Sequence, residues 1–202
     1  MASSSNSCNQ LLTANFISSC AGLAKIGGID GTVYIGFRSD IATLALTAGA
    51  ITTLTLTSGK KLAKFSGKKE QHEITWESIP MKGSSAMYKH MAKLYLYPET
   101  QADVANLELL ISSKRMFLIY VNLNGKVKAL GIDINPYIGG DFDDERGLAA
   151  TPATYTEGAT VAADTWCELS LEGNFWSAPK FYKPAIALAT TIAELDALSF
   201  TA

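Results

Sequence analysis

The stretch Met116-Phe-Leu-Ile-Tyr-Val121 carries apolar side chains on both of the faces that a β-strand presents. Side chains alternate between the two faces of a strand, so a strand without a polar face has to be covered on both sides. We therefore expect a central, buried strand here.

The residues just before this strand predict a helix over about residues 99–113. The run Thr100-Gln-Ala-Asp103 has the form of a capping box with Asp in place of Glu, which is typical of a helix start. Apolar residues then recur at helical spacing, and we expect them to form the buried side of the helix. These residues are Val104, Leu107 and Ile111.

Further strands are predicted on both sides of this helix and strand. Alternating or β-branched runs occupy Thr32–Phe37, Ile41–Leu46, Ile51–Thr57, Gln71–Ile79, Met87–Tyr97 and Trp166–Leu171. The pair Asn124-Gly125 is a two-residue hairpin signal that returns the chain after the buried strand. The sequence thus predicts a mainly β fold, a β-sandwich or barrel with one packed α-helix, over residues 21–183.

Both ends of the chain are predicted to be extended arms. Residues 1–20 are rich in Ser and Asn and hold too little apolar surface to fold alone. A short helix is indicated near Thr191-Ile-Ala-Glu194, so residues 184–202 form the expected C-terminal arm. Apolar residues of the N-terminal arm are candidate contacts with a neighbouring subunit, namely Leu11, Leu12, Phe16 and Ile17.

The composition favours self-association. Charged residues make up 18% of the chain, against about 25% in ordinary globular domains. A surface short of charge suggests burial against other subunits, although Thr, Ser and Gly could solvate it instead. The formal net charge of −2 gives no overall field that would attract nucleic acid or an anionic membrane.

Two short segments of opposite charge are further candidates for subunit contacts. The basic residues Lys60 to Lys69 are best interpreted as a solvated hairpin edge, with a phosphate-contacting patch as the alternative. The acidic run Asp141-Phe-Asp-Asp-Glu145 has oxygen ligands for calcium but lacks EF-hand spacing, so a solvated or partner-facing loop is favoured. In these two segments, the residues that we predict to contact another subunit are Lys68, Lys69, Asp141, Asp143 and Asp144.

The sequence shows no recognisable catalytic apparatus. His72 and His90 have no Cys or His at metal-ligand spacing, and G-x-S-x-G, H-E-x-x-H and P-loop motifs are missing. The three cysteines form no C-x-x-C pair, which argues against a zinc site and favours a reducing compartment. We expect structural histidines, and no enzyme activity, metal or cofactor.

Membrane insertion is not expected either. The first residues lack the basic region of a signal peptide, and no apolar run approaches the length of about 18 residues that a spanning helix needs. The sequence therefore favours synthesis and assembly in the cytoplasm, without a membrane partner.

Two segments carry a resemblance to a known family. Residues Tyr88–Ile134 and the run Trp166-Cys-Glu-Leu-Ser-Leu-Glu-Gly173 resemble the core of tailed-phage tail-tube proteins, which place one helix against a β-sandwich or barrel. Those proteins carry a late strand of the type polar-Leu-Ser-Leu-Glu-Gly. The run Gly27-Gly-Ile-Asp-Gly-Thr-Val-Tyr-Ile35 also resembles the start of virion proteins from phages that infect Bacteroidetes.

The resemblance implies a structural virion subunit, assembled in the host cytoplasm, whose sheets join across protomers. Rings of such subunits, with hexamers as the candidate symmetry, stack around a channel through which DNA passes as non-specific cargo, and other virion proteins bind the ends. A capsid-decorating or head–tail joining protein would use the same β-rich body. A carbohydrate- or surface-binding β-sandwich is the other alternative, with Trp76, Trp166 and Trp176 as stacking platforms.

Overall fold

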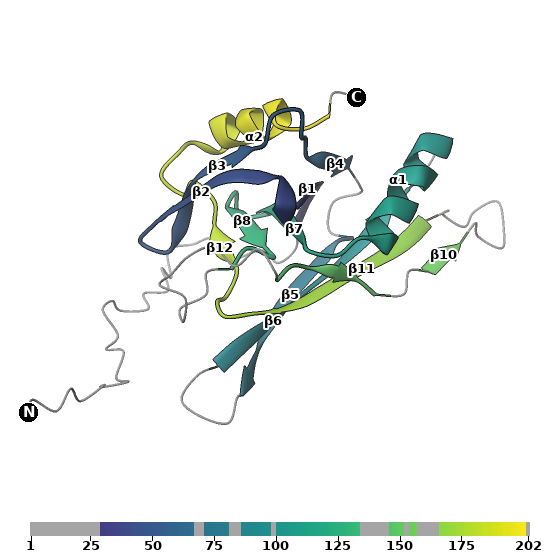
Figure 1. Cartoon of the computed structure of the whole chain (residues 1–202), viewed down its shortest axis with the longest axis horizontal. Helices are drawn as coiled ribbons and strands as arrows, with labels where there is room; N and C mark the ends of the chain where they lie inside the picture. The colour runs from purple at the N-terminus through teal and green to yellow at the C-terminus, as the bar shows by residue number, and fades with distance from the viewer. Residues whose placement is uncertain are drawn as a thin grey trace, which may run out of the picture.

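The computed structural model describes residues 29–66, 71–80, 86–97, 100–133, 146–151, 154–156 and 166–200. The fold of these residues is mainly β, as predicted, and consists of antiparallel sheets with α1 (Gln101–Ser112) packed against them. Figure 1 shows α1 at one side of the body and α2 (Leu188–Ala197) across its top.

The strand β7 (Met116–Asn122) is the buried strand that the sequence predicts. Its six apolar residues are at most 7% exposed. Met116, Leu118 and Tyr120 belong to one hydrophobic core. The alternate residues, which belong to a second core on the other side of the strand, are Phe117, Ile119 and Val121. β7 therefore separates two hydrophobic layers.

β7 is the middle strand of a five-stranded antiparallel sheet. In spatial order this sheet contains β12 (Lys180–Phe181), β8 (Val127–Leu130), β7, β1 (Ile29–Phe37) and β4 (Ala63–Ser66). The position of β4 at the edge agrees with the prediction of a hairpin edge for the basic segment.

The predicted hairpin at Asn124-Gly125 joins β7 to β8. The Gly125 N–H donates to the Asn122 carbonyl oxygen at 2.9 Å, and the Asn122 N–H donates to the Lys126 carbonyl oxygen at 2.9 Å. Within this turn only Gly125 has a positive φ, at +70°. A glycine in the left-handed region is typical of hairpin loops longer than the predicted two residues.

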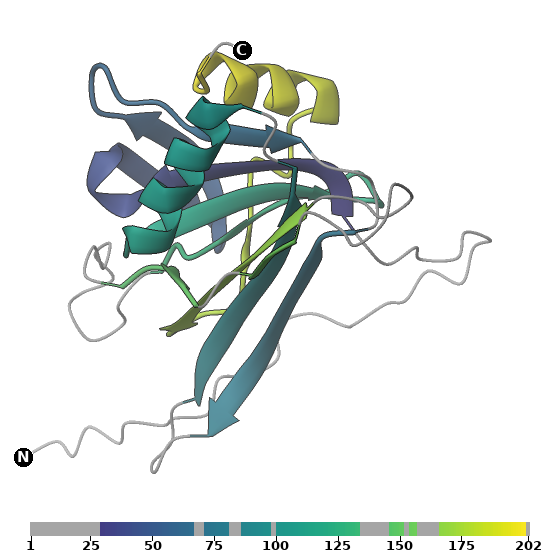
Figure 2. The same ribbon diagram turned by 90° about the vertical axis from the view of Figure 1, so that its right-hand side faces the viewer.

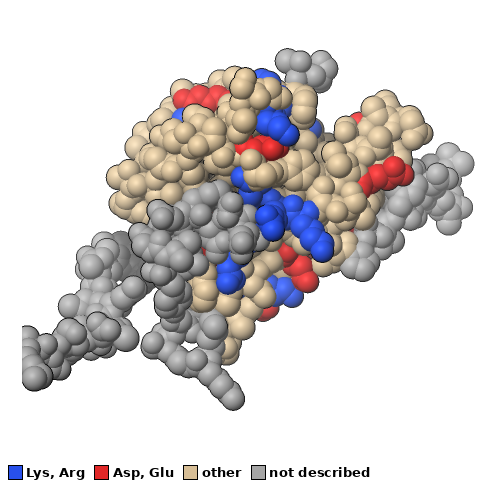
Figure 3. All heavy atoms as spheres, viewed as in Figure 1, with Lys and Arg blue, Asp and Glu red and all other residues tan. Residues whose placement is uncertain are grey.

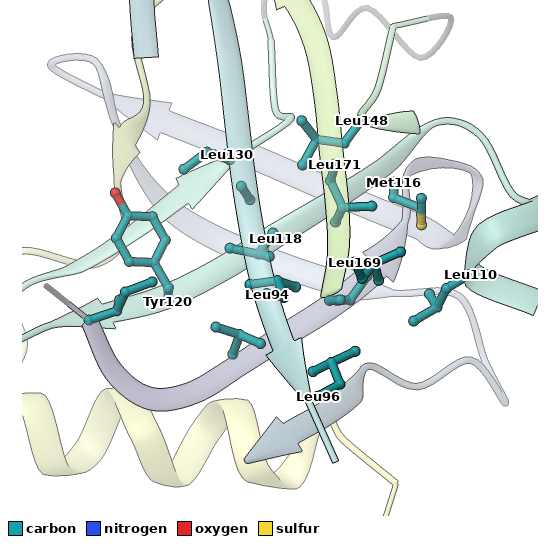
Figure 4. Close-up of a cluster of buried hydrophobic side chains, with 14 of the residues drawn as sticks. Leu94, Leu96, Leu110, Met116, Leu118, Tyr120, Leu130, Leu148, Leu169 and Leu171 are labelled. Atoms are coloured by element: carbon teal, nitrogen blue, oxygen red, sulfur yellow. The ribbon is translucent and has the colours of Figure 1, made fainter. Parts of the chain in front are cut away.

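A second antiparallel sheet covers one face of the first. Its path is β10 (Thr154–Thr156), β11 (Trp166–Phe175), β6 (Ala86–Leu96) and β5 (Glu73–Pro80), and β9 (Ala149–Ala150) also pairs with β11. Figure 4 shows Leu94 of β6 and Leu169 of β11 beside Leu118 of β7. The two sheets form the predicted sandwich and enclose the first core.

Helix α1 begins with the predicted capping box. The Thr100 Oγ accepts from the Asp103 N–H at 3.2 Å, and the Asp103 carboxylate accepts from the Thr100 N–H at 2.9 Å. Its buried side differs from the prediction: Leu107 and Leu110 are 7% and 4% exposed, whereas Val104 and Ile111 are 36% and 42% exposed. Leu107 belongs to two overlapping stripes on the helix, and tertiary packing turns inward the stripe that includes Leu110.

The second core lies between β7 and a layer made of α2 and a separate hairpin. This hairpin consists of β2 (Ile41–Thr47) and β3 (Ala50–Leu56), which follow the short helix η1 (Arg38–Asp40). Ile51 of β3 and Leu195 of α2 are fully buried there. The molecule thus has three layers, with the β7 sheet in the middle (Figures 1 and 2).

The predicted C-terminal helix is present as α2, but it is part of the body instead of an extended arm. Asp196 accepts from the Tyr34 hydroxyl at 2.9 Å and pairs with Lys64 at 2.7 Å. The Leu62 N–H donates to the Leu198 carbonyl oxygen at 2.9 Å. These contacts form because the second face of β7 needs an apolar cover and the apolar stripe of α2 supplies it.

The first prediction concerns the buried side of α1. Replacing Leu107 or Leu110 with Ala should lower the free energy of unfolding by about 2–5 kcal/mol, since each change leaves a cavity. Ile111→Ala, a matched change on the exposed side, should be close to neutral. Urea denaturation of the three variants measures this, and equal losses at all three positions would contradict the assignment.

The second prediction concerns α2. Leu195→Ala should also cost about 2–5 kcal/mol, because Leu195 is fully buried in the second core. Ile186→Ala, just before the helix and 41% exposed, is the control and should change stability little. If Leu195→Ala left the urea midpoint unchanged, α2 would behave as a detachable arm, as the sequence had suggested.

Candidate functional site

The predicted contact residues lie outside the part of the chain that the structure describes. These residues are Leu11, Leu12, Phe16, Ile17, Lys68, Lys69, Asp141, Asp143 and Asp144. Their role as subunit contacts stays a prediction.

The first three lysines of the basic segment contact their own chain. Lys60 pairs with Asp40 at 3.3 Å, and the Lys61 Nζ donates to the Ala197 carbonyl oxygen at 3.0 Å. Lys64 forms the ion pair with Asp196 described above. These lysines tie the edge strand β4 to η1 and α2, so they contribute to the fold of the subunit itself.

His90 is fully buried and links the two sheets. Its Nε2 lies 2.9 Å from the Ser177 carbonyl oxygen, and its Nδ1 lies 3.5 Å from the Gly131 amide nitrogen. A neutral ring with its proton on Nε2 satisfies both contacts. The ring also stacks on Phe175 at 4.5 Å between centroids, and burial lowers the pKa of His90 to about 4.

Other polar groups around His90 are also held by the backbone. Asp133, fully buried, accepts from the Trp176 N–H at 2.5 Å and from the Ser177 hydroxyl at 3.1 Å. The Arg38 guanidinium donates to the Gly131 carbonyl oxygen at 2.8 Å. Gly131 has a φ of +78°, and a Cβ there would lie 2.7 Å from the Met116 carbonyl oxygen. This polar cluster fixes the end of β8 between the sheets.

Burial also shifts the pKa values of other titratable groups in the interior toward their neutral forms. Burial lowers the pKa of His72, with the backbone of Gly31 acting in the opposite direction. Burial raises the pKa of the Cys167 thiol, which disfavours the reactive thiolate. Among the described residues, no group of three or more His, Cys, Asp and Glu side chains is placed to hold a metal ion.

The exposed face of the second sheet carries a ladder of paired charges. Lysines of the central strand β6 face glutamates of β11: Lys89 lies 2.9 Å from Glu172, and Lys93 lies 3.0 Å from Glu168. The hydrogen bonds that both lysines donate to these glutamates raise the pKa of Lys89 and of Lys93.

The glutamates of β5 complete this ladder. Glu73 and Glu77 stand opposite Lys93 and Lys89 in the β5–β6 register. A depression of about 390 Å³ lies on the same face, lined by both charged and uncharged side chains. Its polar side chains are Glu73, Thr75, Lys93, Thr151, Ser170 and Glu172. Lysines and glutamates on this face pair with or stand opposite side chains of the other sign. Such a charged face is suited to contact with water.

The edge of this sheet at β5 is the feature most suited to binding another chain. β5 is eight residues long and, within the described ranges, pairs on one side only, with β6. Figure 2 shows the β5–β6 hairpin projecting well beyond the body. An exposed edge strand offers a row of unpaired backbone N–H and C=O groups to a further strand.

The β5 edge also exposes an aromatic side chain. Trp76 is 48% exposed and packs on Tyr88 with ring centroids 5.7 Å apart and an interplanar angle of 56°. Trp176 is half-buried and carries the Arg146 guanidinium 4.8 Å above its ring. The side chain of Trp166 lies outside the described part. The strand itself was predicted from its alternation, but nothing in the sequence marked it as an edge.

The rest of the visible surface is poor in charge. On the face drawn in Figure 3, uncharged residues cover most of the described surface, and basic and acidic side chains lie near one another.

No family model matches this chain, and comparisons with curated proteins and with solved structures gave no match either. None of the described helices is both long enough and apolar enough to cross a membrane.

The third prediction concerns pH. The unfolded chain protonates His90 near its ordinary pKa of 6.5, while the folded protein does so only at about 4. Stability should therefore fall as the pH drops from about 6.5 to 4, by about 3 kcal/mol, since one pKa unit corresponds to about 1.4 kcal/mol. Below pH 4 this contribution stays constant.

The control is His90→Gln, which keeps a polar side chain but does not titrate. Urea denaturation of both proteins at intervals between pH 4 and 7.5 isolates the histidine, because the carboxylates are common to both. The variant should be less stable at pH 7 and show a flatter dependence on pH. Parallel profiles would mean that His90 is not buried in its neutral form.

Proposed function

We propose that this chain is a structural virion subunit that assembles into rings or a tube of the tailed-phage tail-tube type. The open edge of β5, on a hairpin that projects from the body, is the observation that carries this proposal. When such an edge pairs with a different element of the next copy, the contact is head-to-tail and closes into a ring if the rotation between copies permits.

Three further features support the proposal. The β-sandwich with α1 packed against it is the architecture that the resemblance implies. The buried polar groups link strands to one another, and the described surface offers no exposed histidine or cysteine. A chain with 18% charged residues is suited to burying surface against its neighbours.

The same body can also serve a related structural role in a virion. A capsid-decorating or head–tail joining subunit would form a ring or cluster on another virion protein without stacking into a tube. Microscopy separates the two: the tube proposal expects stacked rings of the purified protein, whereas a decorating subunit gives single rings or monomers until its partner is added.

The fourth prediction tests the β5 edge. Trp76→Lys should abolish rings and tubes in negative-stain images and remove large species from light scattering, because a lysine at the edge opposes the addition of a strand. The thermal midpoint should change little, since Trp76 is about half exposed. Leu109→Lys, on α1 and 56% exposed, is the matched control and should assemble like the unmodified protein.

Two outcomes would overturn this proposal. An unmodified protein that stays a monodisperse monomer at high concentration would remove the ring or tube function. Normal assembly of the Trp76→Lys variant would show that subunits join elsewhere and that the β5 edge is not the contact.

A further inference from the structure

Among the residues that the structure describes, none pairs with the outer edge of β5. Natural edge strands are protected by charged side chains, especially lysines, and by prolines, bulges or short length. β5 has eight residues, no lysine, and a single proline at its last position, Pro80. Its two charged residues, Glu73 and Glu77, stand opposite lysines of β6. The described part of the chain leaves this edge unpaired.

The N-terminal segment leaves the body next to the start of this edge. β1 begins at Ile29, and the ring of His72, just before β5, lies close enough to the Gly31 backbone to affect its pKa. Figure 2 places the starts of β1 and β5 side by side. The 28 residues that precede β1 therefore begin their course at one end of the open edge.

The sequence of that segment matches the edge in pattern and charge. The first 24 residues carry no charged side chain. If the segment is extended, Leu12, Ala14 and Phe16 share one face, and the other face holds Thr13 and Asn15 with Leu11 and Ile17 at its ends.

The two faces of β5 differ in the same way. Ile74 and Trp76 share the side of the sheet that leads to the core, and Trp76 stays 48% exposed there. Glu73, Thr75 and Glu77 lie on the charged side. An added strand with Leu12 and Phe16 on the first side would cover the exposed part of Trp76.

Chain length permits this strand to reach a neighbouring copy. At about 3.3 Å per residue, the eight residues of β5 span about 26 Å. The eleven residues between Ile17 and Ile29 span about 36 Å when extended. An extended linker is therefore longer than the edge of its own subunit, and the apolar run can reach the edge of a neighbouring copy.

We infer that residues 11–18 add as a strand to the open β5 edge of a neighbouring copy of this chain. The inference rests on the proposed function only in requiring a second copy nearby. Each subunit would donate one strand and receive one, which is a head-to-tail contact that repeats around a ring. The sheet would continue from β5 into the donated strand.

Disulfide trapping in the full chain tests this contact. In a background with Cys8→Ser and Cys20→Ser, which leaves the buried Cys167, we combine Thr13→Cys with Thr75→Cys. Mild oxidation should give covalent dimers and longer multimers on a non-reducing gel. The control replaces Thr75→Cys with Glu172→Cys, which lies on the same face but away from the edge and should give no multimers.

Two added substitutions test the face of the strand. Leu12→Asp with Phe16→Asp should reduce the trapped multimers at least tenfold, because charge would meet Trp76. Asn15→Asp adds a charge to the polar face and should reduce them much less. Equal trapping with Thr75→Cys and Glu172→Cys, or disulfides confined to single chains, would overturn the inference.

Hydrogen exchange of the unmodified protein gives an independent test. Amides of residues 73–79 should be protected as strongly as those of β6, and exchange typical of a free edge would overturn the inference. Trapped multimers without rings or tubes would support the donated strand but overturn the proposed function. Rings without trapped multimers would support the proposed function but overturn the donated strand.

Discussion

A strand with no polar face controls this structure. All six apolar residues of β7 need cover, and covering a large apolar side chain contributes about 1.5–3 kcal/mol. One face is covered by the sheet of β5, β6 and β11, and the other by the β2–β3 hairpin and α2. The three layers, and the incorporation of the C-terminal helix into the body, follow from this single requirement.

Each outer layer contacts the core with one face only. The sheet of β5, β6 and β11 therefore has a second face that does not contact the core, and an outer edge at β5. On the face, lysines of β6 pair with glutamates of β11 and stand opposite glutamates of β5. Within the described chain, no strand pairs with the backbone N–H and C=O groups along the outer edge of β5. A solvated face with an open edge is suited to a sheet that continues into another subunit while one side stays in water.

The polar groups in the interior have a structural role. His90, Asp133 and Arg38 bind backbone atoms near Gly131 and Ser177, where strands of the two sheets end. A buried neutral histidine and a buried carboxylate are costly unless hydrogen-bonded, and here each of them is. These groups therefore link the ends of the two sheets through hydrogen bonds that have little access to solvent.

Features that depend on near neighbours could be predicted from the sequence: the buried strand at Met116–Val121, the capping box of α1 and the hairpin after β7. Each follows from periodicity or from residues a few positions apart. Tertiary structure alone decided that Leu110 rather than Ile111 is buried, that α2 joins the core, and that β5 lies at an edge. A local pattern shows which side chains need cover, but the order of strands and the shape of the opposing layer decide what covers them and what stays open.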